Sequence, residues 1–384
     1  MMKLCINALN LRNHLGGIGW YAYYLVRYLK KTNPSLEITI LTHSGVAGQF
    51  NSLGRDVTVW VFHCRKLWIK VLYFQLCVPF LVKKQFDVLH SIGNIGMMVC
   101  PIPQIITICD TYEKVSPQRF SFAKRFLMGL MISISGRNAA AIITISKNTL
   151  KDIARFYPYL KNKSHLIYLG NKFEPEKKTR YKPLPQFLFV GTIEPGKNLA
   201  TVIKALAIVN TLGKKTTLKV IGAPGWKQSA LSRLIEKLNC ADQITFCGYT
   251  TDEQLKHEYQ SSYALICASV YEGFGLPVIE ALACGCPVIC ANNSALPEAG
   301  ADCVVYFNAE DENELSEKML WLLNNPQKVQ DNIRAGFLHA SRFTWDKTAQ
   351  ETYELYQRVV LKKLRPSNAE FFDPSTGNSG SSLG

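Results

Sequence analysis

Short runs of apolar residues, rich in β-branched side chains, alternate along the chain with longer stretches in which apolar residues recur at helical spacing. In the first half, Ile18, Tyr21, Leu25 and Leu29 recur every three or four residues, which predicts a helix with one buried face. The short runs predict strands. In this half the runs are Lys3–Ala8, Glu37–Thr42, Val57–Phe62, Phe86–His90, Ile105–Cys109 and Ala141–Ile145.

The same alternation restarts after a polar segment rich in lysine and proline, Glu174–Pro185. Strands that alternate with helices are typical of parallel sheets with helices on both faces, so two such series predict two doubly wound α/β domains. Ligands of such sheets lie beyond the carboxyl ends of the strands, and we therefore expect a site in the interdomain cleft. The strands of the second series are Phe187–Val190, Leu218–Ile221, Ile244–Cys247, Ala264–Ala268, Pro287–Cys290 and Val304–Phe307.

The composition excludes several other classes of protein. The chain has 384 residues, of which 47% are hydrophobic and 19% charged, so a disordered protein is excluded and two domains are favoured. The best candidate for a membrane span, Leu67–Val82, has 16 residues and is interrupted by Lys70, Gln75 and Pro79, whereas a spanning helix needs roughly 18–20 apolar residues. We expect no signal peptide, because the first 20 residues contain no apolar h-region.

The twelve cysteines indicate neither disulfides nor a metal. Most lie in apolar runs such as Leu265–Cys267 and Val288–Cys290, where a thiol behaves as a small hydrophobic side chain. Disulfide frameworks are typical of short exported chains, so we expect reduced thiols in the cytoplasm. Cys284, Cys286 and Cys290 lie close together but without a histidine or a second cysteine pair at zinc-finger spacing, which disfavours a metal site.

The net charge of +15 belongs entirely to the N-terminal half. Residues 1–170 contain 21 Lys and Arg against 6 Asp and Glu, whereas residues 171–384 contain 23 of each. Two apolar segments with basic ends, 65–84 and 119–137, suit an anionic membrane interface. The alternative is two core helices with solvated ends. Nucleic acid is disfavoured as a partner, because the aromatic residues do not alternate with basic ones as in a stacking groove.

The most informative segment begins where a predicted strand ends, near Ser269. A loop with two glycines follows, and Pro277 then occupies the first turn of a predicted helix, a position that proline favours. This arrangement leaves the amides of Phe274, Gly275 and Leu276 without partners at the N-terminus of the helix. An anion, above all a phosphate, is the natural ligand of such amides.

Two carboxylates stand on either side of this predicted phosphate site, Glu272 in the loop and Glu280 in the helix. Carboxylates do not bind phosphate, but they accept hydrogen bonds from the hydroxyl groups of a sugar or a ribose. For the pair taken alone, the alternative is a capping loop followed by a helix with a solvated glutamate. The full segment is far more specific than the pair.

The run Glu272-Gly-Phe-Gly-Leu-Pro-Val-Ile-Glu280 resembles the two-glutamate signature of the retaining glycosyltransferases of family 4, also called glycosyl transferases group 1. The resemblance covers about residues 3–360 and is stronger in the C-terminal half, where it includes Ala295–Glu298 and Phe343–Trp345. It implies the GT-B fold, which consists of two doubly wound Rossmann-like domains with an interdomain cleft and a C-terminal crossover helix.

The resemblance also implies roles and domain limits. Glu272 would contact the transferred sugar and Glu280 the ribose of the nucleotide, while the amides of Phe274, Gly275 and Leu276 would face the sugar and the diphosphate. An N-terminal acceptor-binding domain is expected at 1–178, the crossover helix at about 346–364 and a C-terminal donor-binding domain at 183–345. The composition of the last residues separately predicts a disordered tail at 366–384.

A segment at the start of the second series resembles the strand and turn that supply cations to the diphosphate in the family. It runs from Val190 to Asn198 and contains Thr192 and Lys197. The usual Arg of the family is missing, and Gly196 stands just before Lys197. A lysine beside a helix start is a suitable point charge for a leaving phosphate.

Two places in the N-terminal half also match the family. Gly16 and Gly17 follow the first predicted strand and open a helix, as in the glycine loop of the family, without the Gly-x-Gly-x-x-Gly spacing of a dinucleotide site. At the end of a later strand the family has His-Asp, and this chain has Cys109 and Asp110. Asp110 is thus the catalytic candidate there, although an aspartate in this position can also cap the next turn.

These features together predict a retaining glycosyltransferase of surface-polysaccharide (lipopolysaccharide) biosynthesis. Its donor would be a GDP-, UDP- or dTDP-linked sugar and its acceptor a saccharide, expected to be lipid-linked. The leaving diphosphate gains negative charge, which Lys197 and the amides of Gly16 and Gly17 would stabilise together with the helix amides. The sequence contains no Asp-x-Asp pair, so we expect a metal-independent reaction without a cofactor.

The expected location is the cytoplasm, at the inner face of the cytoplasmic membrane. Cys109 and Gly196 motivate an alternative function, a catalytically weak sugar-nucleotide-binding subunit of a glycosyltransferase complex. A GT-B sugar-nucleotide epimerase is a third interpretation, which only the shared architecture supports. A hydrolase with two catalytic carboxylates is disfavoured, because Glu272 and Glu280 would both bind the donor.

Overall fold

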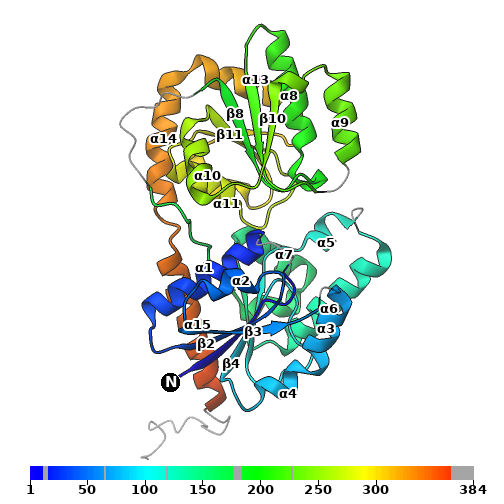
Figure 1. Cartoon of the computed structure of the whole chain (residues 1–384), viewed down its shortest axis with the longest axis vertical. Helices are drawn as coiled ribbons and strands as arrows, with labels where there is room; N and C mark the ends of the chain where they lie inside the picture. Colours follow the sequence, from blue (N-terminus) through cyan, green and yellow to red (C-terminus); the bar gives the residue numbers. More distant parts are fainter. Residues whose placement is uncertain (12–15, 65, 118–119, 176–183, 226–227, 365–384) are drawn as a thin grey trace, which may run out of the picture.

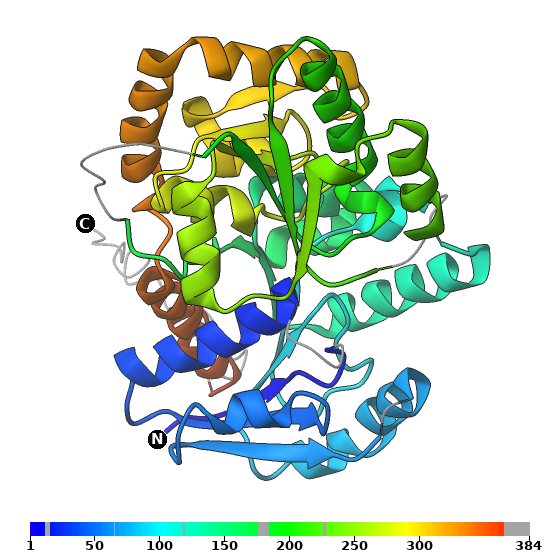
Figure 2. The same ribbon diagram turned by 45° about the horizontal axis from the view of Figure 1, so that its top comes forward.

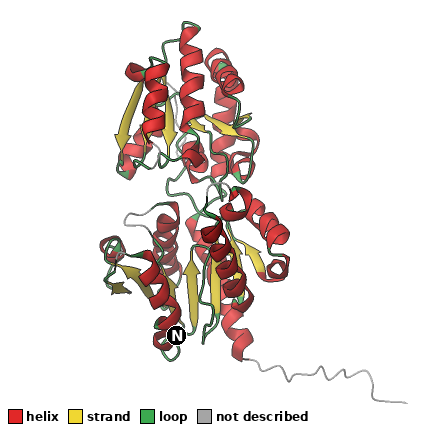
Figure 3. Cartoon of the chain, turned by 90° about the vertical axis from the view of Figure 1, so that its right-hand side faces the viewer, coloured by secondary structure: helices red, strands yellow, loops and turns green. Residues whose placement is uncertain are grey.

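The computed structural model describes residues 1–11, 16–64, 66–117, 120–175, 184–225 and 228–364. They form two lobes, one above the other in Figure 1, and each lobe contains a parallel sheet with helices on both faces, as Figure 3 shows. The predicted α/β class with two doubly wound domains is therefore confirmed. The predicted tail at 366–384 lies outside the described residues.

The N-terminal domain contains a seven-stranded sheet with the order β3-β2-β1-β4-β5-β6-β7. The chain changes direction across the sheet between β1 and β4, so the loop after β1 lies at the switch point where such sheets bind ligands. The strands are β1 Lys3–Asn7, β2 Glu37–His43, β3 Val57–Phe62, β4 Val88–Ile92, β5 Gln104–Ile108, β6 Ala141–Thr144 and β7 Ser164–Leu166. The helices are α1 Gly17–Thr32, α2 Ala47–Asn51, α3 Leu67–Leu76, α4 Val78–Val82, α5 Tyr112–Val115, α6 Phe122–Asn138, α7 Lys147–Phe156 and the 3₁₀ turn η2 Pro158–Lys163.

The C-terminal domain contains a six-stranded sheet with the order β10-β9-β8-β11-β12-β13, so its switch point lies between β8 and β11. The strands are β8 Gln186–Val190, β9 Thr217–Ile221, β10 Ile244–Gly248, β11 Ala264–Cys267, β12 Val288–Ala291 and β13 Val305–Phe307. The helices are α8 Leu199–Thr211, α9 Gln228–Lys237, α10 Asp252–Ser261, α11 Leu276–Ala283, α12 Leu296–Gly300, α13 Glu312–Asn324, α14 Pro326–Ala340 and α15 Trp345–Leu364, with 3₁₀ turns η3 Pro195–Lys197, η4 Ala241–Gln243 and η5 Ala301–Cys303.

The bounds of most strands in the N-terminal sheet lie within one residue of the prediction, and two larger differences occur. The fourth strand begins at Val88 and not at Phe86, because the Phe86 amide still donates to the Val82 carbonyl, 3.3 Å away, in the turn that ends α4. The short strand β7 was not predicted. Its residues, Ser164–Leu166, are only half-buried at the edge of the sheet and lack a run of β-branched side chains.

The last helix, α15, leaves the C-terminal domain and packs along α1 of the N-terminal domain, as Figure 2 shows. The Trp345 ring stacks on the Tyr24 ring with centroids 5.3 Å apart. Farther along α15, the Tyr356 hydroxyl lies 2.6 Å from Nδ1 of His90, which is fully buried. Burial lowers the pKa of His90 to about 3, so this histidine is neutral. Its hydrogen bond with Tyr356 holds α15 against the N-terminal domain.

The chain passes between the domains twice, and the two crossings lie side by side. The Asn171 amide donates to the Phe343 carbonyl at 2.9 Å. Gly170 precedes this contact and has no room for a side chain, because a Cβ atom there would lie 2.3 Å from the Trp345 nitrogen. The close approach of the two segments makes them a compact hinge between the domains.

Candidate active site

A cavity of about 490 Å³ lies between the two domains, a size within the range of small-molecule sites. Its walls come from the loops after β1, β5, β8 and β11 and from the N-terminus of α11, which places it at the carboxyl ends of both sheets. The lining includes all ten residues that the sequence singled out: Gly16, Gly17, Asp110, Thr192, Lys197, Glu272, Phe274, Gly275, Leu276 and Glu280.

The N-terminus of α11 presents unpartnered amides to this cavity. Gly275 is the N-cap residue with φ +111°, a conformation that favours glycine, and Pro277 lies in the first turn. Among the described residues, none accepts a hydrogen bond from the amides of Phe274, Gly275 or Leu276. These donors and the positive end of the helix dipole are thus available to an anion in the cavity.

Lys197 and Glu272 form an ion pair on the cavity wall. The same carboxylate oxygen accepts from the Ser269 hydroxyl at 2.7 Å, and the Glu272 amide donates to the Ser294 hydroxyl at 2.9 Å. Burial opposes the charged form of Lys197, but the Glu272 carboxylate outweighs burial and raises the pKa of Lys197 above its ordinary value. Lys197 is therefore a permanent cation held in one position, as stabilisation of a leaving phosphate requires.

Asp110 faces the cavity from the end of β5. Its Oδ1 accepts from the Tyr112 amide at 3.2 Å and from Nδ2 of Asn94 at 3.4 Å, so it also caps the turn at α5. Burial raises the pKa of Asp110 above its ordinary value. Burial also raises the pKa of the neighbouring Cys109 thiol, so the thiol is neutral and cannot replace a histidine as a base.

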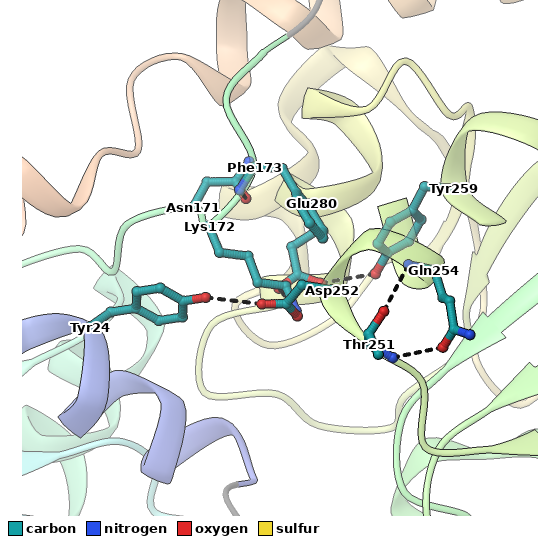
Figure 4. Close-up of polar contacts among 9 residues, drawn as sticks. All are labelled: Tyr24, Asn171, Lys172, Phe173, Thr251, Asp252, Gln254, Tyr259 and Glu280. Carbon is teal, nitrogen blue, oxygen red and sulfur yellow. Dashed lines mark hydrogen bonds and ion pairs between the residues drawn. The ribbon is translucent and has the colours of Figure 1, made fainter. Parts of the chain in front are cut away.

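Glu280 is part of a cluster of charged and hydroxyl side chains that Figure 4 shows. One carboxylate oxygen of Glu280 accepts from the Tyr259 hydroxyl at 3.0 Å, and the other lies 3.8 Å from the Lys172 ammonium. Lys172 also pairs with Asp252 at 2.6 Å, and the Tyr24 hydroxyl of α1 donates to Asp252 at 3.2 Å. The cluster thus links the N-terminal domain, the hinge and the C-terminal domain.

Two residues that support the site, Lys172 and Asn94, were not predicted from the sequence. Lys172 is far from Glu280 and Asp252 along the chain, and nothing in its flanking sequence marks it as their partner. Asn94, which donates to Asp110 and accepts from the Cys109 amide at 2.8 Å, follows the unpredicted left-handed turn at Gly93. In the part of the chain that the structure describes, no three His, Cys, Asp or Glu side chains gather as metal ligands.

As the pH is lowered, the affinity for the donor is expected to begin to fall at a higher pH than it would if Glu280 had the pKa of an ordinary glutamate. Burial raises the pKa of Glu280 above its ordinary value of 4.5 even though Lys172 acts in the opposite direction. The resemblance implies that Glu280 accepts hydrogen bonds from ribose hydroxyls. The ionised carboxylate is a better acceptor than the protonated form, so the affinity should decline as the pH falls through this raised pKa. Calorimetric titration with nucleoside diphosphates between about pH 4 and pH 8 measures the effect.

The control for this measurement is Glu280→Gln, which cannot ionise at this position. This variant should bind nucleoside diphosphates more weakly, and its affinity should not decline further as the pH is lowered over that range. Circular dichroism at each pH separates loss of affinity from loss of fold. An equally steep decline in Glu280→Gln would show that another group is responsible.

Two parallel-sheet domains that enclose unpartnered amides, a half-buried lysine and two carboxylates at the carboxyl ends of their strands have the architecture of the GT-B fold. The sequence model described as glycosyl transferases group 1 matches residues 171–339, and the model described as glycosyltransferase family 4 matches residues 15–171. The chain belongs to the family 4 (group 1) glycosyltransferases.

One curated relative is O-antigen chain mannosyltransferase B of Escherichia coli, which is 27% identical over 232 residues. The match covers 57% of this chain and 61% of that protein, which is less than two thirds of its length. Two solved structures share the fold over nearly the whole chain. Sucrose-phosphate synthase from Thermosynechococcus elongatus has a TM-score of 0.75 at 18% identity, covering 94% of this chain and 100% of that one. Anabaena HepE in complex with UDP-glucose has a TM-score of 0.72 at 18% identity, covering 93% and 100%.

Proposed function

We propose that the protein transfers a sugar from a nucleoside-diphosphate sugar to a saccharide acceptor, with retention of the anomeric configuration, in surface-polysaccharide biosynthesis. The observation that carries this proposal is that the free amides of Phe274, Gly275 and Leu276 line the same cavity as Lys197 and Glu280. An anion-binding group in one cavity with a cation and a hydroxyl-binding carboxylate suits a diphosphate that is linked to a ribose.

In the proposed complex, the diphosphate binds the α11 amides and Lys197, the ribose hydroxyls donate to Glu280, and the transferred sugar lies against Glu272. The bond between the anomeric carbon and the phosphate oxygen breaks, and the leaving diphosphate takes both bonding electrons. The acceptor oxygen bonds the anomeric carbon and loses its proton, and Asp110 is the carboxylate on the N-terminal side of the cavity in a position to accept it. Lys197 and the α11 amides supply the positive charge for this step without a metal or a cofactor.

The test is turnover with a panel of GDP-, UDP- and dTDP-linked sugars, measured as release of the nucleoside diphosphate with and without saccharide acceptors. Proton NMR of the product gives the anomeric configuration. Release of nucleotide with at least one donor supports the proposal. Tight nucleotide binding without turnover on any acceptor would favour the alternative of a sugar-nucleotide-binding subunit, which the neutral Cys109 and Gly196 motivate. Absence of both binding and turnover would contradict the two hypotheses alike.

An exposed apolar surface on the N-terminal domain supports a lipid-linked acceptor. The loop 96–98 connects α3 and α6, because the Met98 amide donates to Gln75 of α3 at 2.8 Å and Asn138 of α6 donates to the Met98 carbonyl; α4 directly follows α3. Phe80 is 81% exposed and Phe122 is 72% exposed, so these helices are not the fully buried core helices of the alternative interpretation. The apolar patch consists of Trp68, Leu72, Leu76, Phe80, Phe122, Phe126, Leu127 and Leu130.

Exposed basic side chains belong to the same segments of the chain. They are Lys66, Lys83, Lys84 and Lys124, whereas Arg65 and Arg119 lie outside the described residues. In the described part of the chain, no helix combines the length and the apolarity that a membrane crossing requires. We infer that the patch lies in the anionic inner face of the cytoplasmic membrane, with the acceptor delivered from that surface.

In flotation with anionic liposomes, we expect the protein to float with the liposomes at low salt. A smaller fraction should float at high salt, because salt screens the basic side chains. The double variant Phe80→Ser, Phe122→Ser should bind at least about 10-fold more weakly, since it removes two large apolar side chains from the interface. Leu338→Ser, at a residue that is 67% exposed on α14 of the C-terminal domain, is the matched control. No flotation of the unmodified protein at low salt would contradict the membrane proposal and leave the donor chemistry intact.

A further inference from the structure

A carboxylate of the C-terminal domain binds the N-terminus of a helix in the N-terminal domain. Glu298, on α12, accepts hydrogen bonds from the Lys147 amide through Oε2 and from the Asn148 amide through Oε1, each at 2.7 Å. The Tyr168 hydroxyl donates to the same carboxylate at 3.1 Å. The two amides are the first of α7 and have no partner within the helix, and the helix dipole adds to the attraction.

This contact is not needed to cap α7 within its own domain. The N-cap residue Ser146 already accepts from the Thr149 amide at 3.0 Å. Its backbone is extended, with φ −153° and ψ 158°, as at an ordinary helix start. The Glu298 carboxylate therefore adds little to local helix formation, and its main physical consequence is to join the two domains.

A second contact holds α7 against the loop that carries Glu272. The Tyr271 hydroxyl donates to the Asp152 carboxylate of α7 at 2.7 Å. Nδ2 of Asn148 donates to the same carboxylate oxygen at 3.1 Å, so the two contacts are connected through the helix. Because Tyr271 directly precedes Glu272, the position of α7 is transmitted to a residue of the cavity wall.

Between these contacts the two domains touch at the catalytic loops. A Cβ atom on Gly273 would lie 2.2 Å from the Cys109 carbonyl oxygen, and the Thr149 hydroxyl of α7 donates to that same oxygen at 3.1 Å. Cys109 precedes Asp110, and Gly273 follows Glu272. The contacts of α7 with the C-terminal domain thus set the separation of the two carboxylates that face the donor from opposite domains.

We propose that Glu298 is a positioning residue, which holds the closed arrangement of Glu272 and Asp110 through its carboxylate on the α7 amides. The inference rests on the proposed function and extends it to a group that does not line the cavity. Glu298 contacts neither donor nor acceptor. It acts by keeping reacting groups from two domains in register, where a displacement of about 1 Å can cost roughly 100-fold in rate.

Lys147→Pro is the direct test, because it removes one of the two amide donors and little else. Proline is favoured at the first position of a helix, and the extended backbone of Ser146 suits the residue before a proline. The reference is Lys147→Ala, which loses the same exposed side chain but keeps the amide. We expect Lys147→Pro to lower kcat about 10-fold relative to Lys147→Ala, as loss of one hydrogen bond to a charged group predicts. The affinity for the nucleoside diphosphate should change less than kcat, because most of its proposed binding groups, Lys197, Glu280 and the α11 amides, lie in the C-terminal domain.

Glu298 variants complete a double-mutant cycle. Glu298→Ala should lower kcat at least as much as Lys147→Pro, and Lys147→Pro should add no further loss in the Glu298→Ala background. Glu298→Gln keeps one acceptor oxygen, so its kcat should lie between that of the parent protein and that of Glu298→Ala. Equal kcat in Lys147→Pro and Lys147→Ala, or independent and multiplicative losses in the cycle, would overturn the proposal.

Small-angle X-ray scattering of the ligand-free proteins tests the same contact without any activity. The radius of gyration should rise in Lys147→Pro and in Glu298→Ala relative to Lys147→Ala, as the domains separate. If no donor is turned over but the radius rises, the transferase proposal fails while the domain contact stands. If turnover is found but neither the radius nor kcat responds to these variants, the positioning role fails and the transferase proposal stands.

Discussion

Lys197→Ala is expected to lower turnover by about 100-fold or more, the usual cost of losing one fixed group that stabilises a developing negative charge. Lys197 is held against Glu272 on the wall of the cavity, and the carboxylate raises the pKa of Lys197, so its charge is present throughout the physiological range. The charge on the leaving diphosphate grows as the glycosidic bond breaks. Loss of Lys197 should therefore reduce kcat more than the affinity for the ground-state donor.

Steady-state kinetics with the preferred donor measure this effect, and Lys204→Ala is the matched control. Lys204 forms an ion pair with Glu312 at 3.1 Å on the surface of the same domain, where such pairs contribute little. Thermal unfolding of both variants separates a catalytic loss from a loss of stability, since Lys197→Ala leaves the partly buried Glu272 without its cation. Turnover of Lys197→Ala within a factor of about two of the parent would remove Lys197 from the mechanism.

Gly273→Ala is expected to lower turnover by roughly 100-fold through a different cause, the loss of domain closure. The added methyl group would lie 2.2 Å from the Cys109 carbonyl oxygen, closer than atoms approach without displacement of the backbone. The two domains must then separate, and Glu272 moves away from Asp110. The amides of α11 and Glu280 belong to one domain, so nucleotide binding should persist while turnover is lost.

Calorimetry with the nucleoside diphosphate and donor turnover together distinguish this outcome from misfolding. Gly48→Ala, at an exposed helical glycine with no atom within 4 Å of the added carbon, is the control and should match the parent in both measurements. Gly273→Ala with unchanged kcat would mean that the contact between Gly273 and Cys109 is not part of the reactive arrangement.

Much of the fold was predictable because its signals are local. Buried parallel strands are continuous apolar runs, and helices show their period within a few turns, so the strand prediction differs by only a few residues at each end. The loop that binds the anion was predictable for a similar reason. Glycine at a left-handed position and proline in the first helical turn, Gly275 and Pro277, mark such a turn within nine residues of sequence.

The partners of the predicted groups could not be found in this way. Lys172, in the segment between the domains, forms an ion pair with Glu280, and Asn94, in another loop, donates a hydrogen bond to Asp110. Neither stands at a fixed sequence distance from its partner. The role of the apolar segments that form α3, α4 and α6 could not be decided from the sequence either, because an apolar helix fits a buried core as well as a membrane surface. Only the positions of Phe80 and Phe122 outside the core separate these two interpretations.

Sequence periodicity and turn chemistry were sufficient to establish two parallel-sheet domains, the anion-binding helix start and the residues at the strand ends, because each depends on neighbours along the chain. The pairing of Glu298 with the α7 amides, the contact of Gly273 with Cys109 and the assembly of one cavity from loops of both domains depend on how the two domains meet. Contacts between residues more than 100 positions apart leave no periodic or spacing signal, since hydrogen bonding and packing act through distance in space alone.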